Sequence, residues 1–368
     1  MNYDPFKEYI KQTEPNKKYK GYAWSTAIGL QAVDGLEPSE QLLKTAIDNI
    51  EGYITMEDAQ KRIDSYYAAK PQKDIEDRTE EADKVSVRIA SILSEKSFSF
   101  SPSEYIGIHK KLFSGIYKHA GKIRDYNITK KEWVLDGATV LYGNAAELRE
   151  TLEYDFSEEK KFSYKGLTTN EIIHHLAFFI SRLWQIHIFG EGNTRTTSVF
   201  FIKYLRSLGY DVTNDIFAEN AWYFRNALVR ANYTNLQKDI HETTVYLEAF
   251  IRNLLLNENN VLKNRNLHIN NLFKPENQAI DDEKQAIDGK KQAVQSRIAE
   301  IKLNIQTKTN IETLYKSVGA EKVFGRSDVA KICNLSYSAA GSVIAKMKEH
   351  NLIETVKGYG KGKYKFLI

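Results

Sequence analysis

Apolar side chains recur at helical spacing in the middle of the chain, in two runs separated by a short polar loop. The first run has its apolar positions at Ile172, Ile173, Leu176, Phe179, Ile180, Leu183 and Ile186. They repeat every three to four residues, which predicts a buried helix that leads into the loop. The second run, Val199 to Leu205, predicts another core helix that ends at Gly209.

The loop between these helices, residues 187–197, reads HIFGEGNTRTT and concentrates residue types that suit phosphate chemistry. His187 exchanges a proton near neutral pH, and Glu191 offers hard oxygen to Mg²⁺. Gly192 and Asn193 allow backbone N–H groups to approach phosphate oxygens, and Arg195 adds a forked cation. Because a helix begins directly after the loop, its first N–H groups can also face an anion.

These residues resemble the signature loop of the Fic (fido) family, whose usual form is HPFx(D/E)GNGRxxR. The matching positions are His187, Phe189, Glu191, Gly192, Asn193 and Arg195. The resemblance implies a mainly α protein with a fido helical core and a β-hairpin flap. It also implies transfer of AMP from ATP, with Mg²⁺, to a Ser, Thr or Tyr hydroxyl of a target protein.

The roles of the loop residues follow from the same resemblance. His187 is expected to act as general base on the attacking hydroxyl, and Glu191 to hold Mg²⁺. Gly192, Asn193, Thr194 and Arg195 are expected to bind the phosphates and stabilise the charge that develops there.

Upstream, residues 121–143 resemble the family's flap, and Asp136 with Gly137 form a turn dipeptide between β-favouring residues. The resemblance implies that residues 132–142 bind the target protein by strand addition. It also implies that Val134 and Leu135 lie beside the nucleotide.

Downstream, residues 222–233 (WYFRNALVRANY) resemble the helix that lines the family's adenine pocket. Asn232 occupies the position of an asparagine that contacts the base. Tyr223 is expected to form the aromatic wall of the pocket. The resemblance covers residues 80–256 as core.

The loop departs from the family pattern where Thr194 replaces a glycine and Ser198 replaces the terminal arginine. A threonine at a position that needs positive φ would be strained. Residues 24–43 resemble the small antitoxin domain of some Fic toxins, and Asp34 stands where an inhibitory glutamate is usual. Since that glutamate pairs with the terminal arginine, both partners are altered here. We expect residues 1–70 to pack on the active site with glutamate-type inhibition weakened or replaced.

After the core, residues 257–312 are predicted to form a helical connector, with a seven-residue stripe at Ile280, Ile287, Val294 and Ile301. The stripe fits either a coiled-coil dimer seam or a helix laid against the protein. Lys284 and Lys291 lie at the second heptad position, and these charges favour a helix laid against the protein. The sequence also leaves a homodimer as an alternative.

Residues 313–368 show the pattern of a winged helix-turn-helix, with two short helices followed by strands on either side of a glycine-rich wing. Ten basic against four acidic residues give this segment a charge of +6, so the rest of the chain, at +4 overall, carries −2. The charge favours DNA, with Tyr337, Ser338, Ser342 and Lys346 in the major groove and Lys361 and Lys363 on phosphate. A protein-docking role is the alternative.

The composition excludes few classes of protein, since 42% hydrophobic and 27% charged residues are ordinary for a globular protein. No run approaches a membrane span, and the N-terminus lacks the apolar region of a signal peptide. The single Cys333 excludes an intrachain disulfide and suits a reducing cytoplasm. Two alternatives to AMP transfer remain: a DNA-binding regulator with a drifted fido core, and a fido enzyme that transfers another NTP-derived group.

Overall fold

The chain divides into two units, residues 1–273 and 274–368, each with its own core. The computed structural model describes residues 6–11, 14–70, 78–212, 216–270, 303, 305–319, 322–356 and 362–367. The heptad stripe Ile280, Ile287, Val294 and Ile301 lies outside these residues. Each unit is described by itself.

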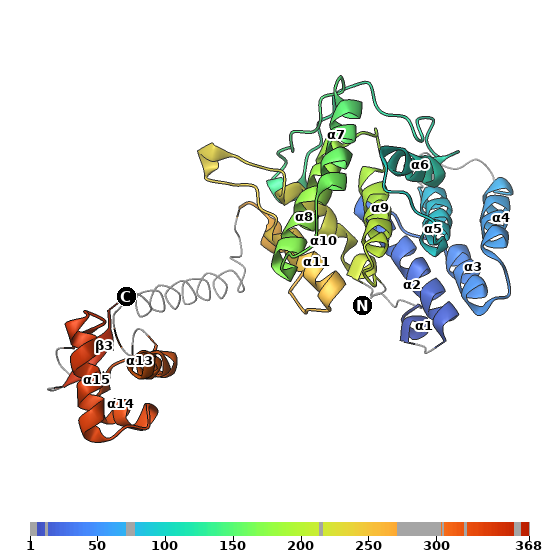
Figure 1. Cartoon of the computed structure of the whole chain (residues 1–368). Helices are drawn as coiled ribbons and strands as arrows, with labels where there is room; N and C mark the ends of the chain where they lie inside the picture. Colours follow the sequence, from blue (N-terminus) through green and yellow to red (C-terminus); the bar gives the residue numbers. More distant parts are fainter. Residues whose placement is uncertain are drawn as a thin grey trace. The chain divides into compact units, whose positions relative to one another are not determined.

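The first unit is built from helices, which confirms the predicted mainly α class (Figure 1). Its α-helices are α1 (Lys7–Lys11), α2 (Pro15–Gly29), α3 (Glu40–Glu51), α4 (Met56–Ala68), α5 (Thr79–Ser94), α6 (Pro102–Phe113), α7 (Leu148–Lys161), α8 (Thr169–Ile186), α9 (Asn193–Ser207), α10 (Ile216–Arg230) and α11 (Val245–Leu256). Its 3₁₀ turns are η1 (Leu30–Asp34), η2 (Trp133–Leu135), η3 (Leu236–Lys238) and η4 (Asn264–Leu267).

The two predicted core helices are α8 and α9, which pack against each other. The Thr168 side chain accepts from the Glu171 backbone N–H, and the Glu171 carboxylate accepts from the Thr168 N–H, which satisfies free donors at the start of α8. The apolar face of α8 is buried in the core of the unit. The loop between α8 and α9 is therefore anchored by a packed helix on either side.

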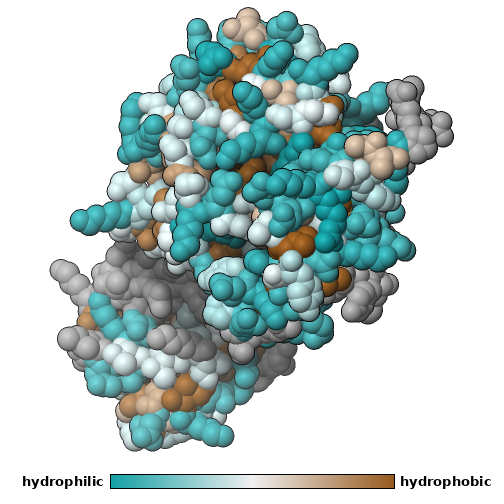
Figure 2. Space-filling model, turned by 90° about the vertical axis from the view of Figure 1, so that its right-hand side faces the viewer, coloured by the Kyte–Doolittle hydropathy of each residue, from teal (hydrophilic) through white to brown (hydrophobic). Residues whose placement is uncertain are grey.

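The N-terminal segment packs into the same unit as the predicted core rather than forming a separate body. Helix α2 lies against α5 and α10, and its Trp24 is fully buried. On the face shown in Figure 2, hydrophilic residues predominate and apolar residues form small separate patches. Element η1 contacts α9, the helix that follows the loop, within this unit.

The flap segment differs from the expected β-hairpin. The chain reverses between residues 130 and 139, with a hydrogen bond of 2.9 Å from the Glu132 N–H to the Ala138 carbonyl. The turn between them is η2, with Asp136 and Gly137 at positive φ as the turn dipeptide predicts. No strand is assigned in this part of the described chain, and the backbone hydrogen bonds of residues 132–138 close the turn around η2.

The second unit follows the order expected for a winged helix-turn-helix: α13 (Ile305–Val318), β1 (Phe324–Gly325), α14 (Arg326–Ile332), α15 (Tyr337–Glu349), β2 (Ile353–Thr355) and β3 (Lys363–Phe366). The strands form an antiparallel sheet in the order β1-β3-β2. Helix α13 begins before the expected boundary at 313, and its Ile311 and Leu314 are fully buried in this core. Tyr337, Ser338 and Ser342 are exposed on α15, while Lys361 lies outside the described residues. DNA binding by this unit stays a prediction.

Asp83 on α5 ties the N-terminal helices to the core. Its carboxylate accepts from the Ser39 N–H at 2.8 Å, from the Ser39 hydroxyl at 2.5 Å and from the Tyr67 hydroxyl at 2.8 Å. Burial nevertheless raises the pKa of Asp83, which shows how strongly the site is desolvated. The three donors come from the start of α3 and the last turn of α4, so one buried carboxylate fixes both helices.

We predict that Tyr67→Phe lowers the free energy of unfolding by about 1–2 kcal/mol, because it removes one donor from a buried acceptor. Urea denaturation measures the effect. The matched control is Tyr66→Phe, since the neighbouring hydroxyl makes no hydrogen bond among the described residues. Equal losses in the two variants would contradict this role of Asp83.

Candidate active site

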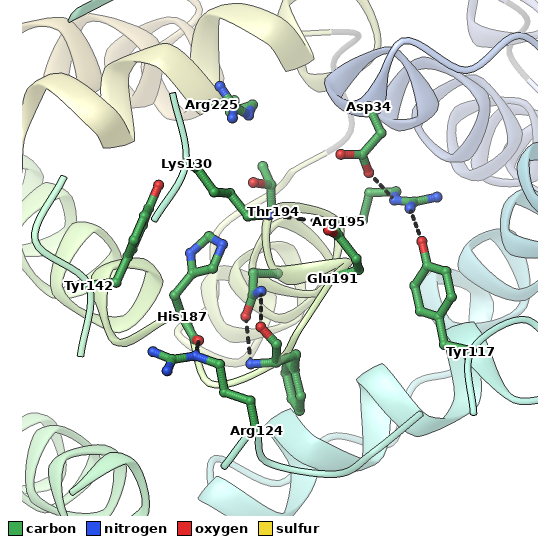
Figure 3. A network of polar contacts seen from close by, with 12 residues as sticks. Asp34, Tyr117, Arg124, Lys130, Tyr142, His187, Glu191, Thr194, Arg195 and Arg225 are labelled. Atoms are coloured by element: carbon green, nitrogen blue, oxygen red, sulfur yellow. Dashed lines mark hydrogen bonds and ion pairs between the residues drawn. The ribbon is translucent and has the colours of Figure 1, made fainter. Parts of the chain in front are cut away.

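Helix α8 ends at His187, which adopts the left-handed conformation at φ 52° and ψ 54°. A non-glycine residue with positive φ is uncommon and stops the helix at this point. The His187 backbone N–H still donates to the Trp184 carbonyl at 3.1 Å, which caps the last turn. The side chain is thereby turned away from the axis of α8 and toward the loop (Figure 3).

The imidazole of His187 is buried, with 3% of its surface exposed, and it is held in one tautomer. Its Nδ1 lies 3.3 Å from the Trp184 carbonyl and donates to it, which leaves the lone pair on Nε2. The rings of Tyr142 and Trp184 lie 4.4 and 5.2 Å away, centroid to centroid. Nε2 is buried and has no hydrogen-bond partner among the described residues, so it is free to accept a proton.

Burial lowers the pKa of His187 well below its ordinary value, and the cations of Lys130, Arg225 and Arg124 lower it further. The hydrogen bond with the Trp184 carbonyl acts in the opposite direction but is outweighed. A lowered pKa means that the imidazole is neutral at physiological pH. His187 therefore has the protonation state that a general base requires.

Arg124 clamps the backbone around His187. Its Nε donates to the His187 carbonyl at 2.8 Å, and its terminal nitrogens donate to the carbonyls of Tyr126, Gly143 and Ile186 at 2.5, 2.6 and 3.4 Å. One guanidinium thus joins the end of α8 to both ends of the flap segment. Arg124 lies within the segment that resembles the flap. Its contact with His187, which is 63 residues further along the chain, cannot be predicted from a local sequence pattern.

The loop is shaped from within by Asn193, whose amide forms a closed pair of hydrogen bonds with Phe189. The Phe189 N–H donates to Oδ1 at 3.0 Å, and Nδ2 donates to the Phe189 carbonyl at 2.8 Å. The amide of Asn193 is therefore committed to the loop backbone, and its contact with phosphate stays a prediction. Phe189 is fully buried, as an anchor of the loop must be.

His109 supports the loop from outside and was not recognised in the sequence. Its ring stacks on Phe189 at 3.6 Å between centroids. Nδ1 accepts from the Gly121 N–H at 2.8 Å, so Nε2 carries the proton and donates to the Glu191 carbonyl at 3.0 Å. Burial lowers the pKa of His109 to about 4, which keeps it neutral in this bridging role.

Beyond His187, positive φ within the loop falls on Gly192, at 76°, and not on Thr194. A Cβ on Gly192 would lie 2.4 Å from Cε2 of Phe113, so space as well as conformation requires glycine. Thr194 is in the first turn of α9, and its hydroxyl accepts from the Trp184 indole N–H at 3.0 Å. The strain considered for Thr194 is therefore absent.

Arg195 is fully buried, and Figure 3 shows Asp34 and Tyr117 beside its guanidinium. Nε lies 2.8 Å from Oδ2 of Asp34, and one terminal nitrogen donates to Oε1 of Gln31 at 2.9 Å. The other donates to Oε1 of Glu81 at 2.6 Å and to the Tyr117 hydroxyl at 3.2 Å. Burial opposes the charge, but Asp34, Tyr117 and Glu81 outweigh it and raise the pKa of Arg195.

Asp34 pairs with Arg195, the first arginine position of the loop pattern, whereas the family's glutamate pairs with the terminal arginine position, which is Ser198 here. The hydroxyl of Ser198 instead donates to the Thr194 carbonyl at 2.9 Å. Glu81, in the first turn of α5, is 7% exposed and pairs with Arg195. Its neighbours Thr79, Glu80 and Asp83 are polar, so no local sequence pattern indicates its burial.

Glu191 is the exposed carboxylate of the loop, and 55% of its side-chain surface is accessible to solvent. Its one ion pair among the described residues is with Lys130 of the flap segment, at 3.4 Å between Nζ and Oε2. No group of three potential ligands is present in the described part of the chain. A single accessible carboxylate nevertheless suits Mg²⁺, which is usually bound by one or two carboxylates together with substrate phosphates.

The residues expected around the adenine are buried. Tyr223 is 2% exposed, and its hydroxyl donates to the Tyr246 carbonyl at 3.3 Å. Asn232 is 8% exposed, and Nδ2 donates to the carbonyls of Ser181 and Leu228 at 3.0 and 2.9 Å. Val134 and Leu135 are fully buried in η2. Contact of these four residues with a nucleotide stays a prediction.

Part of the chain is similar to known proteins. Residues 99–205 match the model of the Fic/DOC family. The protein adenylyltransferase VbhT of Bartonella schoenbuchensis is 31% identical over 108 residues, which cover 29% of this chain and 21% of that protein. A Fic family protein of known structure from Desulfovibrio desulfuricans G20 shares 11% identity at a TM-score of 0.41, over 98% of this chain and 91% of that one.

The match to the Fic/DOC family thus includes the loop, as the resemblance predicts, while the core bounds 80–256 stay a prediction. The chain spans about a fifth of the length of VbhT, so the activity of the whole protein is a matter for proposal. No described helix has the length and apolar character needed to cross a membrane. The cytoplasmic location stays a prediction.

We predict that Gly192→Ala destabilises the protein by about 3 kcal/mol or more, because it adds a clash with Phe113 to the cost of positive φ. Gly166→Ala is the matched control, since Gly166 has φ 84° and open space around it. It should cost only about 1 kcal/mol. Urea denaturation compares the two, and equal costs would mean that the loop yields to the added methyl group.

Proposed function

We propose that this chain is a Fic-type protein adenylyltransferase, which transfers AMP from ATP to a Ser, Thr or Tyr hydroxyl of a target protein. The observation that carries the proposal is the buried, neutral His187 with a free Nε2, placed beside a loop shaped for phosphate. The Fic/DOC match over residues 99–205 and the relationship to an adenylyltransferase support it.

In the proposed reaction the target hydroxyl gives its proton to Nε2 of His187 as its oxygen attacks the α-phosphorus. The new P–O bond forms while the bond from the α-phosphorus to the bridging oxygen breaks, and pyrophosphate leaves with that electron pair. The loop held by Asn193 and His109 offers backbone N–H groups at the start of α9 to the phosphates. Mg²⁺ held by Glu191 and the phosphates would neutralise charge there.

Labelling with ATP tests the proposal. The protein is incubated with cell lysate and Mg²⁺, with the label on either the α- or the γ-phosphate. We expect transfer from the α-position only, reduced about 10²–10⁴-fold in His187→Ala, the usual contribution of a general base. The control is His174→Ala, an exposed histidine of the same helix paired with Glu248. Label from the γ-position would indicate a kinase, and no label would favour the DNA-binding regulator.

We further propose that the N-terminal segment restrains this activity through Arg195. Three of the five N–H groups of the Arg195 guanidinium donate to Gln31, Glu81 and Tyr117, and Nε lies against the Asp34 carboxylate, so most of this group is committed to protein partners in this arrangement. Asp34 and Gln31 both belong to η1, so displacement of one short element frees two sides of Arg195. Glu81 would remain to compensate the buried charge.

We predict that Asp34→Ala increases α-label transfer several-fold without unfolding the protein, because Arg195 keeps Glu81 as its counter-ion. Glu37→Ala is the control, since it removes an acidic residue of the same segment that has no described contact with Arg195. A rate in Asp34→Ala equal to that of the unmodified chain would exclude restraint by this ion pair.

A further inference from the structure

The cations around the loop are nearly all committed to protein groups. Arg195 is held by the cluster described above, Arg124 by four carbonyls, and Arg225 by the buried Glu132, with an NH1–Oε2 distance of 2.7 Å and an NH2–Oε1 distance of 3.1 Å. Ser198, at the family's terminal arginine position, is uncharged and bonded to its own helix. A triphosphate at this loop therefore lacks the cation that the family pattern supplies.

Lys130 is the exception. Its side chain is 29% exposed, and its ion pair with Glu191 is long, at 3.4 Å. The Lys130 backbone N–H donates to the Thr139 hydroxyl at 3.3 Å, which helps to fix the residue across the chain reversal of the flap segment. Its side chain extends over the loop between His187 and Glu191 (Figure 3).

This position is where the phosphates must lie if the proposed function holds. The α-phosphorus has to be near Nε2 of His187, and the phosphate oxygens near Glu191 and the start of α9. A lysine ammonium is a compact cation on a flexible stem, so it reaches a phosphate oxygen by a small change in its side chain. The weak pair with Glu191 costs little to break because both groups are partly in water.

We propose that Lys130 is a phosphate-binding residue for the nucleotide and supplies from the flap segment the positive charge that Ser198 does not provide. The inference rests on the proposed function, since it assumes that ATP binds at this loop. Lys130 then exchanges Glu191 for a phosphate oxygen when the nucleotide binds. In the absence of nucleotide, the same side chain covers the loop and keeps Glu191 paired.

The test is the affinity for ATP, measured by calorimetry on the full chain with Mg²⁺, in the unmodified protein and in the Asp34→Ala background. We expect Lys130→Met to raise the Kd for ATP about tenfold or more, the effect of one charge-assisted contact. Lys130→Arg keeps the charge and should bind nearly as well as the unmodified protein. Lys131→Met is the matched control, because Lys131 is exposed and forms no ion pair with the described residues.

The outcomes separate this inference from the proposed function. If ATP binds and Lys130→Met has the same Kd as the unmodified chain, the inference is wrong and the adenylyltransferase proposal stands. Equal losses in Lys130→Met and Lys131→Met would also overturn it, because they would reflect the general positive field of the segment. If neither background binds ATP, both proposals are wrong.

Discussion

The buried guanidinium of Arg195 connects the N-terminal segment, α5 and the loop in a single group of contacts. A buried cation is tolerated only when its charge and its donors are matched, and removing a partner commonly costs about 3–5 kcal/mol. Here Asp34 and Glu81 match the charge, and Gln31, Glu81 and Tyr117 accept hydrogen bonds from the terminal nitrogens. The packing of η1 and the start of α5 therefore depends on the same side chain that we propose the phosphates contact.

The rest of the site follows from the two rigid helices that meet at the loop. Helix α8 fixes the position of His187, and α9 begins with the Gly192 turn that exposes backbone N–H groups. Arg124, Asn193 and His109 then hold the loop backbone, so the site is preorganised without a ligand. Preorganised donors are what stabilise charge in a phosphoryl transition state.

The sequence predicted the helices and the loop because they depend on local pattern. The apolar spacing before residue 187 located α8, and the glycine at 192 marked the turn. The sequence did not reveal the roles of Arg124, Lys130, His109 and Glu81, because these roles come from contacts between distant segments. Nor did it show that Asp34 pairs with Arg195, because the family pattern assigned that role to position 198. Burial of Glu81 in a polar stretch is a tertiary effect that no local pattern encodes.

The central claim is that η1 and the nucleotide phosphates share Arg195. Hydrogen–deuterium exchange of residues 30–35, measured with and without saturating ATP and Mg²⁺, tests it most directly. The account predicts faster exchange in this segment when ATP is bound, because the phosphates draw Arg195 away from Asp34 and Gln31. Unchanged exchange under conditions where calorimetry shows ATP bound would contradict it.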